Sequence, residues 1–434
     1  MTPGARLRAA TEVLEEVLNR HRPIAGALSD WRRGHRFAGS GDNAAIGNLV
    51  YDAMRQRRSV AARLGGEAPR ALVLGVAAEA FSVSPDRVIA MADGSRHALD
   101  PVTDAEAAAI HATLDDSADL GVRADVPDWL LPQLKVAFGA DDRVAFEGRA
   151  FARRAPLDIR VNTLKADREK TAAALVHTDC VPTQLAPHGL RIPAQEGSRR
   201  LPNVEAEGAH GRGWFEIQDE SSQLAAALAG AGPRMQVLDL CAGAGGKTLA
   251  LGAHMQNTGQ LYAYDHDKQQ LRPIFDRIRR AGLRSVQVID AGREEELDQL
   301  GARFDVVFVD APCSGSGTWR RRPDAKWRLT PKQLNIRIAE QRRALERAAG
   351  LVAPGGRLVY ATCSVLPSEN AEQVAWFRDA YPAFEVASWV ERWSAVFGRA
   401  PDIASVNGDS ETLLLSPGQH ETDGFFVAFF NRRA

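Results

Sequence analysis

Two cysteines with a nearby carboxylate are the residues of this chain best suited to chemistry. Cys313 follows the apolar stretch FDVVFVD (304–310), and Cys363 ends the stretch RLVYATC (357–363). Small polar residues follow both cysteines, whereas a structural cysteine usually lies within an apolar run, where its thiol is unreactive. Ligands of open α/β sheets bind where the strands end. Because Asp310 precedes the first cysteine by three residues, the three side chains together indicate thiol chemistry on a bound substrate.

A pair of thiols beside a carboxylate has a specific use in methylating a pyrimidine ring. Carbon 5 of cytosine is too weak a nucleophile to take a methyl group directly, but a thiolate that adds to carbon 6 activates it, which is covalent catalysis. An acid near ring nitrogen 3 stabilises the adduct, and a base must later remove the carbon-5 proton. Residue chemistry alone leaves the nucleophile open, since DNA cytosine methyltransferases use a cysteine that follows proline, as Cys313 does. Packing at two strand ends is the alternative interpretation of both thiols.

A glycine-rich loop directly follows a predicted strand at 235–240. Its residues are Cys241, Ala242, Gly243, Ala244, Gly245, Gly246 and Lys247. Such a loop lets the backbone approach a ligand and presents amide donors at the start of a helix. A phosphate-binding P-loop would need glycine at 241, and a dinucleotide site would need glycine at 248. An S-adenosylmethionine site fits better, because it also needs an acid at the end of the second strand, where Asp265 stands. A turn-forming acid is the alternative interpretation of Asp265.

The elements that must position these residues alternate between strand and helix from residue 235 onward. This alternation predicts an α/β, doubly wound, mostly parallel sheet, with the strands of Cys313 and Cys363 as neighbours. The predicted strands are 235–240, 261–265, 286–290, 304–310 and 357–363, with helices at 268–281 and 331–351 and a closing hairpin at the tail. Residues 1–124 read as all-helical, 125–205 as a small α+β unit with a strand at 156–164, and 206–434 as the sheet domain.

Composition excludes several classes of protein. The 434 residues carry 54 basic and 55 acidic side chains, so the chain is not a polycation. No apolar run is long enough to cross a bilayer, and four cysteines without a CxxC pair argue against a disulfide framework and a zinc site. We expect reduced thiols, no metal, no membrane association and a cytoplasmic location. A basic stretch at 318–343 contains Trp319 and Trp327, a combination that suits phosphates and unstacked bases, although a solvated helix face is the alternative.

The motifs together resemble one family, the RsmB/Sun-type RNA (cytosine-5) methyltransferases. The resemblance rests on CAGAGGKT, DAPCSGSGTWRRRPDAKW, YATCSVLPSEN and HETDGFF, and it is strong over 205–434. RVNTLK (160–165) and QDESS (218–222) extend it through the middle unit, which in the family is a small RNA-recognition-like lobe. The helical N-terminus resembles, more loosely, the NusB-like RNA-binding domain of the bacterial ribosomal-RNA members.

The resemblance implies a role for each matching residue. It makes Cys363 the nucleophile and Cys313 the thiol that assists product release, with Asp310 contacting cytosine and the donor region. It also places Lys247 near the target base.

The same resemblance implies how the donor is bound. The loop from Cys241 to Lys247 would hold S-adenosylmethionine, and Asp265 would bind its ribose. Asp290, after the third strand, would be the acid near the adenine, with a shift of one position from the family pattern as the alternative. Cys241 and Cys180 are expected to have no catalytic role.

We therefore expect an S-adenosylmethionine-dependent methyltransferase that forms 5-methylcytosine in RNA, with 16S ribosomal RNA as the preferred substrate and a monomeric protein. The target base must be unstacked, because carbon 6 is unreachable inside a helix. Transfer RNA as substrate, a P-loop-like ATPase and a non-catalytic RNA-binding assembly factor are the alternatives. The modified nucleotide, and whether free RNA or a ribosomal particle is bound, are left open.

Overall fold

The computed structural model describes residues 1–434, which pack as two compact units. The helical unit comprises Met1–Ala155, Ala194–Leu201 and Thr318–Leu329, and the sheet unit comprises Pro156–Pro193, Pro202–Gly317 and Thr330–Ala434. Two short segments, 194–201 and 318–329, therefore belong to the helical unit although they lie far along the sequence. The three-part division at residues 124 and 205 stays a prediction about functional parts. None of the helices is both long and apolar enough to span a bilayer.

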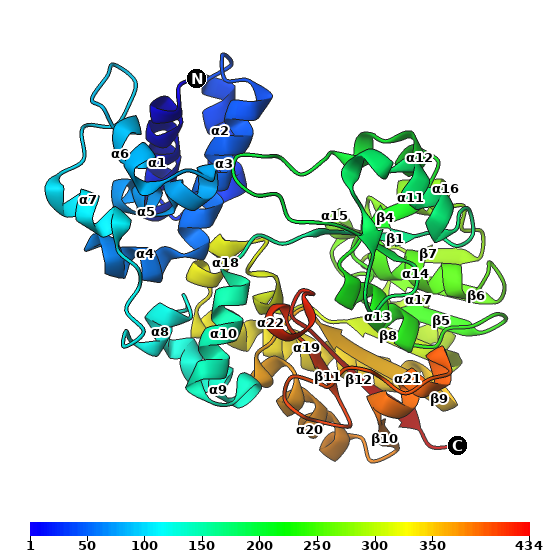
Figure 1. Ribbon diagram of the computed structural model, residues 1–434. Coiled ribbons are helices and arrows are strands. Elements are labelled where there is room, and N and C mark those ends of the chain that lie inside the picture. The colour runs from blue at the N-terminus through cyan, green and yellow to red at the C-terminus, as the bar shows by residue number, and fades with distance from the viewer. The chain divides into compact units, whose positions relative to one another are not determined.

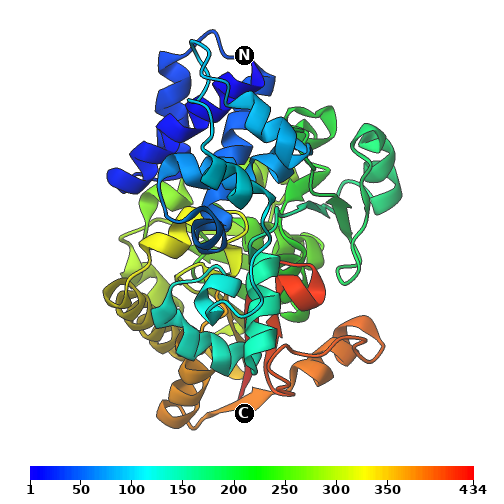
Figure 2. The same ribbon diagram turned by 60° about the vertical axis from the view of Figure 1, so that its left-hand side comes forward.

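The helical unit is built around a core of small and aliphatic side chains. Thr2 begins the first helix by accepting a hydrogen bond from the backbone N–H of Ala5, and Pro3 fits the first helical position. Leu7, Leu14 and their neighbours in this helix are buried together against the third and fifth helices. Figures 1 and 2 show these helices, in blue to cyan, gathered in one bundle. The helices are α1 (Pro3–Asn19), α2 (Ile24–Gly34), α3 (Ser40–Arg55), α4 (Arg57–Leu64), α5 (Pro69–Phe81), α6 (Pro85–Met91), α7 (Asp104–His111), α8 (Leu120–Arg123), η1 (Asp128–Leu130), α9 (Leu131–Phe138), α10 (Asp141–Phe151) and α18 (Pro323–Arg328).

The sheet unit contains a small antiparallel sheet in the order β2-β3-β1-β4. Its core includes Ile159, Leu190 and Phe215, which are fully buried. The predicted strand at 156–164 is shorter in the structure. The elements are β1 (Leu157–Val161), α11 (Arg168–Ala174), η2 (Val176–Thr178), β2 (Val181–Pro182), β3 (Gly189–Ile192), η3 (Val204–Ala206), α12 (Gly208–Gly211) and β4 (Phe215–Ile217).

The larger sheet of this unit has the order β10-β12-β9-β8-β5-β6-β7, and β11 pairs with β12. Its five strands from β9 to β7 are parallel, whereas β12 and β10 are antiparallel additions at one side. Figure 1 shows helices on both faces, so the predicted doubly wound α/β architecture is confirmed. The strands are β5 (Gln236–Asp239), β6 (Gln260–Tyr264), β7 (Val286–Ile289), β8 (Phe304–Asp310), β9 (Val352–Thr362), β10 (Phe384–Ala387), β11 (Leu413–Leu415) and β12 (Phe425–Arg432).

The helices of this sheet match the predicted alternation, with one break. The helix predicted at 268–281 is two helices, because the ring of Pro273 cannot continue the backbone hydrogen-bond ladder. The helix predicted at 331–351 is present over that range, and its Thr330 forms a capping box with Gln333. The helices are α13 (Glu220–Leu228), α14 (Gly246–His254), α15 (Lys268–Leu271), α16 (Ile274–Ala281), α17 (Glu294–Leu300), α19 (Pro331–Leu351), α20 (Ala371–Ala380), α21 (Trp389–Phe397) and α22 (Pro417–His420), with short 3-10 turns η4 (Ser316–Thr318) and η5 (Pro367–Glu369).

The two tryptophans of the basic stretch both pack within the helical unit, and only Trp319 is buried. Trp319 is 1% exposed and packs edge-to-face on Phe151, and the indole N–H of Trp327 donates to the carbonyl of Met54 at 2.7 Å. Because the Trp319 ring is buried, the interpretation that it holds an RNA base is wrong, whereas for the half-buried Trp327 it stays a prediction.

Candidate active site

The two cysteines lie next to one another beyond the ends of adjacent parallel strands. β8 pairs with β9 in a register that places Asp310 opposite Ala361, so the chain segments that follow the two strands begin side by side. Cys313 Sγ and Cys363 Sγ are 3.3 Å apart, and both residues are half-buried. The hydrogen bond with Cys363, followed by burial, raises the pKa of the Cys313 thiol. Cys313 therefore keeps its proton and can donate it towards the sulfur of Cys363.

A fully buried carboxylate, Glu369, holds the two cysteine loops together. It accepts hydrogen bonds from the backbone N–H of Ser314 at 2.7 Å and from the Ser314 hydroxyl at 2.6 Å. It also accepts one from the Ser364 hydroxyl at 2.5 Å and one from the Gln341 side-chain amide at 3.1 Å. Burial raises the pKa of Glu369 despite these donors. One acid thus contacts the residue after each cysteine and fixes the distance between the thiols.

An ion pair lies at the base of the same site. Lys247 Nζ is 3.0 Å from Asp310 Oδ2. The Lys247 side chain is 5% exposed and that of Asp310 is 32% exposed, so the pair presents its carboxylate rather than its ammonium group to solvent. Lys247 Nζ also lies 4.7 Å from the ring centroid of Phe425, a cation–π distance. Asp310 is therefore the polar group of this pair that a substrate can reach.

The glycine-rich loop has the geometry of a ligand-binding turn. Gly243 and Gly245 have φ of +49° and +88°, a backbone region that favours glycine. The backbone N–H of Gly243 donates to Asp265 Oδ2 at 2.8 Å, and that of Asp267 donates to Asp265 Oδ1 at 2.8 Å. Each carboxylate oxygen can accept a further hydrogen bond, so Asp265 can still bind hydroxyl groups of a ligand.

Asp239, at the end of β5, supports this loop from below. Its Oδ2 accepts a hydrogen bond from the Thr248 hydroxyl at 2.6 Å, while its buried Oδ1 has no hydrogen-bond partner. Burial raises the pKa of Asp239 from 3.8 to about 7. A buried acceptor without a partner at a ligand-binding turn fits a site that is completed by a polar ligand.

Two arginines clamp the loop backbone from outside. Arg160 of β1 donates to the carbonyl of Gly246 at 2.7 Å, and Arg277 of α16 donates to the carbonyl of Ala244 at 2.8 Å. Glu216 of β4 pairs with Arg277 at 2.9 Å and with Arg280 at 2.6 Å. Strand residues of the small sheet thus fix the conformation of the loop on the large sheet.

Two other predicted site residues, Asp290 and Cys241, are not part of the group formed by the two thiols and Asp310. Asp290 follows β7 at the same sheet edge as Asp265, but its side chain is exposed and makes no hydrogen bond. Burial raises the pKa of the Cys241 thiol well above the usual thiol value, and its lack of a catalytic role stays a prediction. The structure therefore brings Cys313, Cys363 and Asp310 to one edge of the sheet and leaves Asp290 apart from them.

Sequence reasoning did not assign a role to Glu369, Gln341 or Arg160. Glu369 was noticed only as part of YATCSVLPSEN. A glutamate six residues after a strand-end cysteine is a weak signal, because an exposed acid would have the same spacing. The sequence around Arg160 predicts only a strand. Its contact with the glycine-rich loop could not be predicted, because its partner Gly246 is 86 residues away along the chain.

Comparison with known proteins agrees with this geometry. A family model described as "16S rRNA methyltransferase RsmB/F" matches residues 227–431, and a second, described as an RsmF/B-like ferredoxin-like domain, matches residues 126–196. The chain is 31% identical to a probable ribosomal RNA small subunit methyltransferase B of Synechocystis, over 72% of this chain and 68% of that protein. It is 34% identical to ribosomal RNA small subunit methyltransferase B of Sodalis glossinidius, over 62% of this chain and 61% of that protein.

A solved structure covers the whole chain. The crystal structure of PH0851 superposes with a TM-score of 0.74 at 26% identity, over 100% of this chain and 99% of that one. The family models cover the glycine-rich loop, both cysteines and the strands β1 to β3 of the small sheet. This chain therefore belongs to the RsmB/F family of 16S ribosomal RNA methyltransferases.

Proposed function

We propose that this chain uses S-adenosylmethionine to methylate carbon 5 of a cytosine in 16S ribosomal RNA. The observation that carries the proposal is the 3.3 Å separation of Cys313 Sγ and Cys363 Sγ beside the carboxylate of Asp310. A single thiol would serve for nucleophilic attack. A second thiol at this distance can serve as the base that removes a proton from the same ring.

The residues around the glycine-rich loop fit the methyl donor. The backbone N–H groups of Ala244 and Gly246 would supply amide donors, since those of Gly243 and Gly245 already donate to Asp265 and Ala242. Asp265 would supply acceptors for ribose hydroxyls. Asp290, which follows the third strand, is proposed as the acid near the adenine. When bound, S-adenosylmethionine supplies an electrophilic methyl group. The loop, which Arg160 and Arg277 fix through the carbonyls of Gly246 and Ala244, would hold the donor.

Cys363 is proposed as the nucleophile that activates the ring. The Cys363 thiol gives up its proton and its sulfur forms a bond to carbon 6, the electron pair of the 5,6 double bond shifts toward carbon 4, and the proton reaches nitrogen 3 through the Asp310 carboxylate. The ammonium group of Lys247, 3.0 Å from Asp310, stabilises the carboxylate that results. Carbon 5 is then nucleophilic enough to be methylated.

Cys313 is proposed as the base that completes turnover. The hydrogen bond to Cys363 that raises the pKa of Cys313 is lost once the Cys363 sulfur is bonded to carbon. Cys313 can then release its proton to solvent and take the proton of carbon 5. The carbon–sulfur bond breaks, Cys363 leaves as a thiolate, and nitrogen 3 returns its proton to Asp310.

The RNA assignment is supported by the names of the relatives, which are ribosomal RNA small subunit methyltransferases. We propose that the helical residues 1–124 and the small sheet within 125–205 position the RNA, and that residues 206–434 carry the chemistry. The target cytosine must leave its stack to bring carbon 6 to Cys363. The protein is proposed to act in the cytoplasm as a monomer.

Covalent trapping tests the proposal. RNA that contains 5-fluorocytidine cannot lose a proton from carbon 5, so the adduct should persist, and mass spectrometry of the digested complex should find it on Cys363. An adduct on another residue, or no adduct with protein that methylates normal RNA, would contradict the mechanism. A protein that binds RNA but transfers no methyl group would support the non-catalytic alternative instead.

Bisulfite sequencing separates the two candidate RNA classes. Total RNA from cells with and without this protein should differ at one or a few cytosines of 16S ribosomal RNA. A difference confined to transfer RNA would support the proposed methylation chemistry but show that transfer RNA, and not 16S ribosomal RNA, is the substrate.

A further inference from the structure

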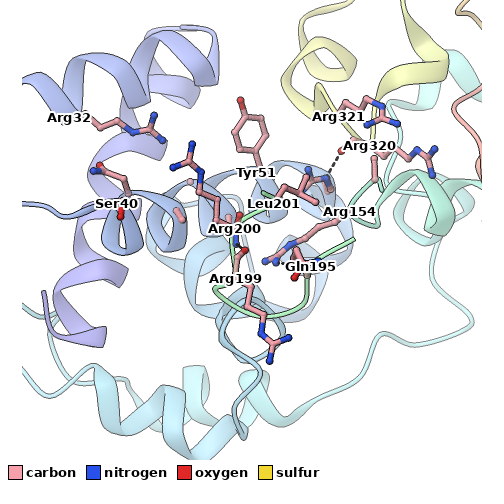
Figure 3. A pocket seen from close by; sticks show the side chains of 16 residues that line it. Arg32, Ser40, Tyr51, Arg154, Gln195, Arg199, Arg200, Leu201, Arg320 and Arg321 are labelled. Atoms are coloured by element: carbon pink, nitrogen blue, oxygen red, sulfur yellow. Dashed lines mark hydrogen bonds between the residues drawn. The ribbon is translucent and has the colours of Figure 1, made fainter. Parts of the chain in front are cut away.

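A second basic site lies within the helical unit, apart from the thiol chemistry. It is a cavity of about 580 Å³, within the size range of ligand sites in proteins. Helices α2 and α3, the chain after α10, and the segments 194–201 and 318–329 line it. Seven of its 16 lining residues are arginines, and none is an aspartate or glutamate. Figure 3 shows these side chains entering from several sides, with Tyr51 between Arg32 and Arg321.

Two of the arginines are fixed by one buried acid. Asp52 accepts hydrogen bonds from Arg55 at 2.6 Å and from Arg154 at 2.5 Å, and its side chain is 6% exposed. One carboxylate thus faces two guanidinium groups and leaves one positive charge without a counter-ion. This arrangement is built into the fold, because both arginines are largely buried.

Arg154 also holds the segment 194–201 against the cavity. Arg154 donates to the carbonyls of Gln195 at 2.9 Å and Gly197 at 2.6 Å. The side-chain amide of Asn48 donates to the carbonyls of Gly197 and Arg199, both at 3.2 Å. These bonds place Arg199 and Arg200, which would otherwise lie on a loop without regular structure, at the wall of the cavity.

Three further arginines of the wall have no counter-ion. Arg32, Arg199 and Arg200 are exposed and form no ion pair or side-chain hydrogen bond. Figure 3 shows Arg199 extending away from the side on which Arg32 and Tyr51 lie. Asp52 neutralises only one of the seven arginines, and the exposed guanidinium groups repel one another, so a bound anion would relieve this repulsion. The fork of a guanidinium group matches the oxygens of a phosphate.

Tyr51 adds an uncharged donor. Burial and the nearby carboxylate of Asp324 raise the pKa of its phenol group, so the hydroxyl stays protonated at neutral pH. The cavity therefore offers cationic and neutral donors and no acidic side chain.

We infer that this cavity binds backbone phosphates of the substrate RNA, at a stretch outside the nucleotide that is methylated. The inference rests on the proposed function and extends it to a second RNA contact. Single-stranded RNA fits better than a duplex, because a cavity of this size admits a nucleotide and not a helix. Free nucleotides and inorganic phosphate share the chemistry, and the experiment must separate them from RNA.

The test compares two double variants of the full-length protein. Arg32→Gln with Arg200→Gln removes two cavity charges that carry no structural hydrogen bond. Arg36→Gln with Arg87→Gln is the matched control, because both arginines are exposed residues of the helical unit outside the cavity. Calorimetry with S-adenosylmethionine on each variant checks that the sheet unit is intact.

Fluorescence anisotropy with labelled single-stranded oligouridine gives the main readout. We expect the cavity variant to bind on the order of tenfold more weakly at low salt, and the slope of log K against log salt to fall by about 0.7 for each lost phosphate contact. In methylation assays its KM for RNA should rise while kcat is retained. RNA affinity equal to that of the control variant would overturn the inference.

Competition by small anions distinguishes the source of the phosphate. Adenosine monophosphate and inorganic phosphate should compete with oligouridine only at far higher concentrations than RNA does. Tight binding of either one that the cavity variant loses, with RNA affinity retained, would assign the cavity to a free anion. Normal methylation by a cavity variant with unchanged RNA affinity would overturn this inference alone, whereas absence of methylation by the wild-type protein would overturn the proposed function alone.

Discussion

The hydroxyl of Ser364 donates a 2.5 Å hydrogen bond to Oε2 of Glu369, which ties the loop of one thiol to a buried acid. The loop of the other thiol is bound to the same carboxyl group through Ser314. Pairing of β8 with β9 fixes the strands, but the cysteines lie beyond the paired residues. The distance between the two sulfurs is therefore set by Glu369 more than by the sheet.

Replacement of Glu369 by glutamine should separate the thiols and destabilise the sheet unit. The amide nitrogen would face donors of Ser314 or Gln341 and leave them without an acceptor, at a cost of about 1–3 kcal/mol. Urea unfolding should show this loss, and kcat for methylation should fall while the affinity for S-adenosylmethionine changes little. Glu372→Gln, at an exposed position of α20, is the control. Unfolding and kcat like those of the control would show that Glu369 does not position the loops.

Removal of each thiol should give a different defect. Cys363→Ala should abolish both methylation and covalent complex, because the remaining thiol, Cys313, has a raised pKa and is proposed to act as the base. Cys313→Ala should still form the adduct but should release it poorly, with turnover lower by about 10²- to 10⁴-fold, the usual contribution of a positioned base. Denaturing gels should show RNA-bound protein for Cys313→Ala only. The reverse pattern would exchange the two roles.

Strand periodicity and turn residues were enough to predict the large sheet from sequence. Each predicted strand from 235 to 363 corresponds to an observed one, because buried parallel strands have continuous apolar runs that end at polar residues. β10 and α10 were not predicted. β10 is a four-residue edge strand with two half-buried residues, which gives too weak a pattern. The chemistry-bearing residues were found because their types and positions at strand ends are unusual.

Contacts between distant segments could not be predicted in the same way. The role of Trp319 depends on Phe151, a partner 168 positions earlier, and sequence position suggested a base-binding role instead. Asn48 and Arg154 likewise acquire a function only when they meet the segment 194–201. Local sequence patterns carry no information about tertiary contacts between distant segments.

The buried carboxyl group of Asp239 should make stability depend on pH. Its pKa is about 7 in the folded protein and 3.8 ordinarily, so between these values the folded state holds a proton that the unfolded chain has released. Stability from this group is thus present at low pH and is lost as pH rises through 7. The side chain of the Asp239→Asn variant cannot ionise, so the variant should not lose this stability. From pH 4 to pH 8 the unfolding free energy of the variant should therefore rise relative to that of the wild type by about a few kcal/mol. Urea titrations across this range measure the difference, and a pH-independent difference would place the titrating group elsewhere.

The clamp from Arg160 to the glycine-rich loop should control donor affinity. Its guanidinium group donates to the Gly246 carbonyl at 2.7 Å and to Gln218 Oε1 at 2.6 Å, and burial lowers its pKa only to about 10, so it stays charged at neutral pH. Arg160→Met would keep the aliphatic stem and remove both bonds.

Without that clamp the loop should sample conformations that cannot bind the donor, because backbone carbonyls of a tight turn need fixed partners. Calorimetry should show the Kd for S-adenosylmethionine rising on the order of tenfold, which is about 1.4 kcal/mol. Arg272→Met, an exposed arginine between α15 and α16, should leave the Kd unchanged. Since Arg160 belongs to the small sheet, equal donor affinity in the two variants would mean that this sheet acts on RNA alone and does not shape the donor site.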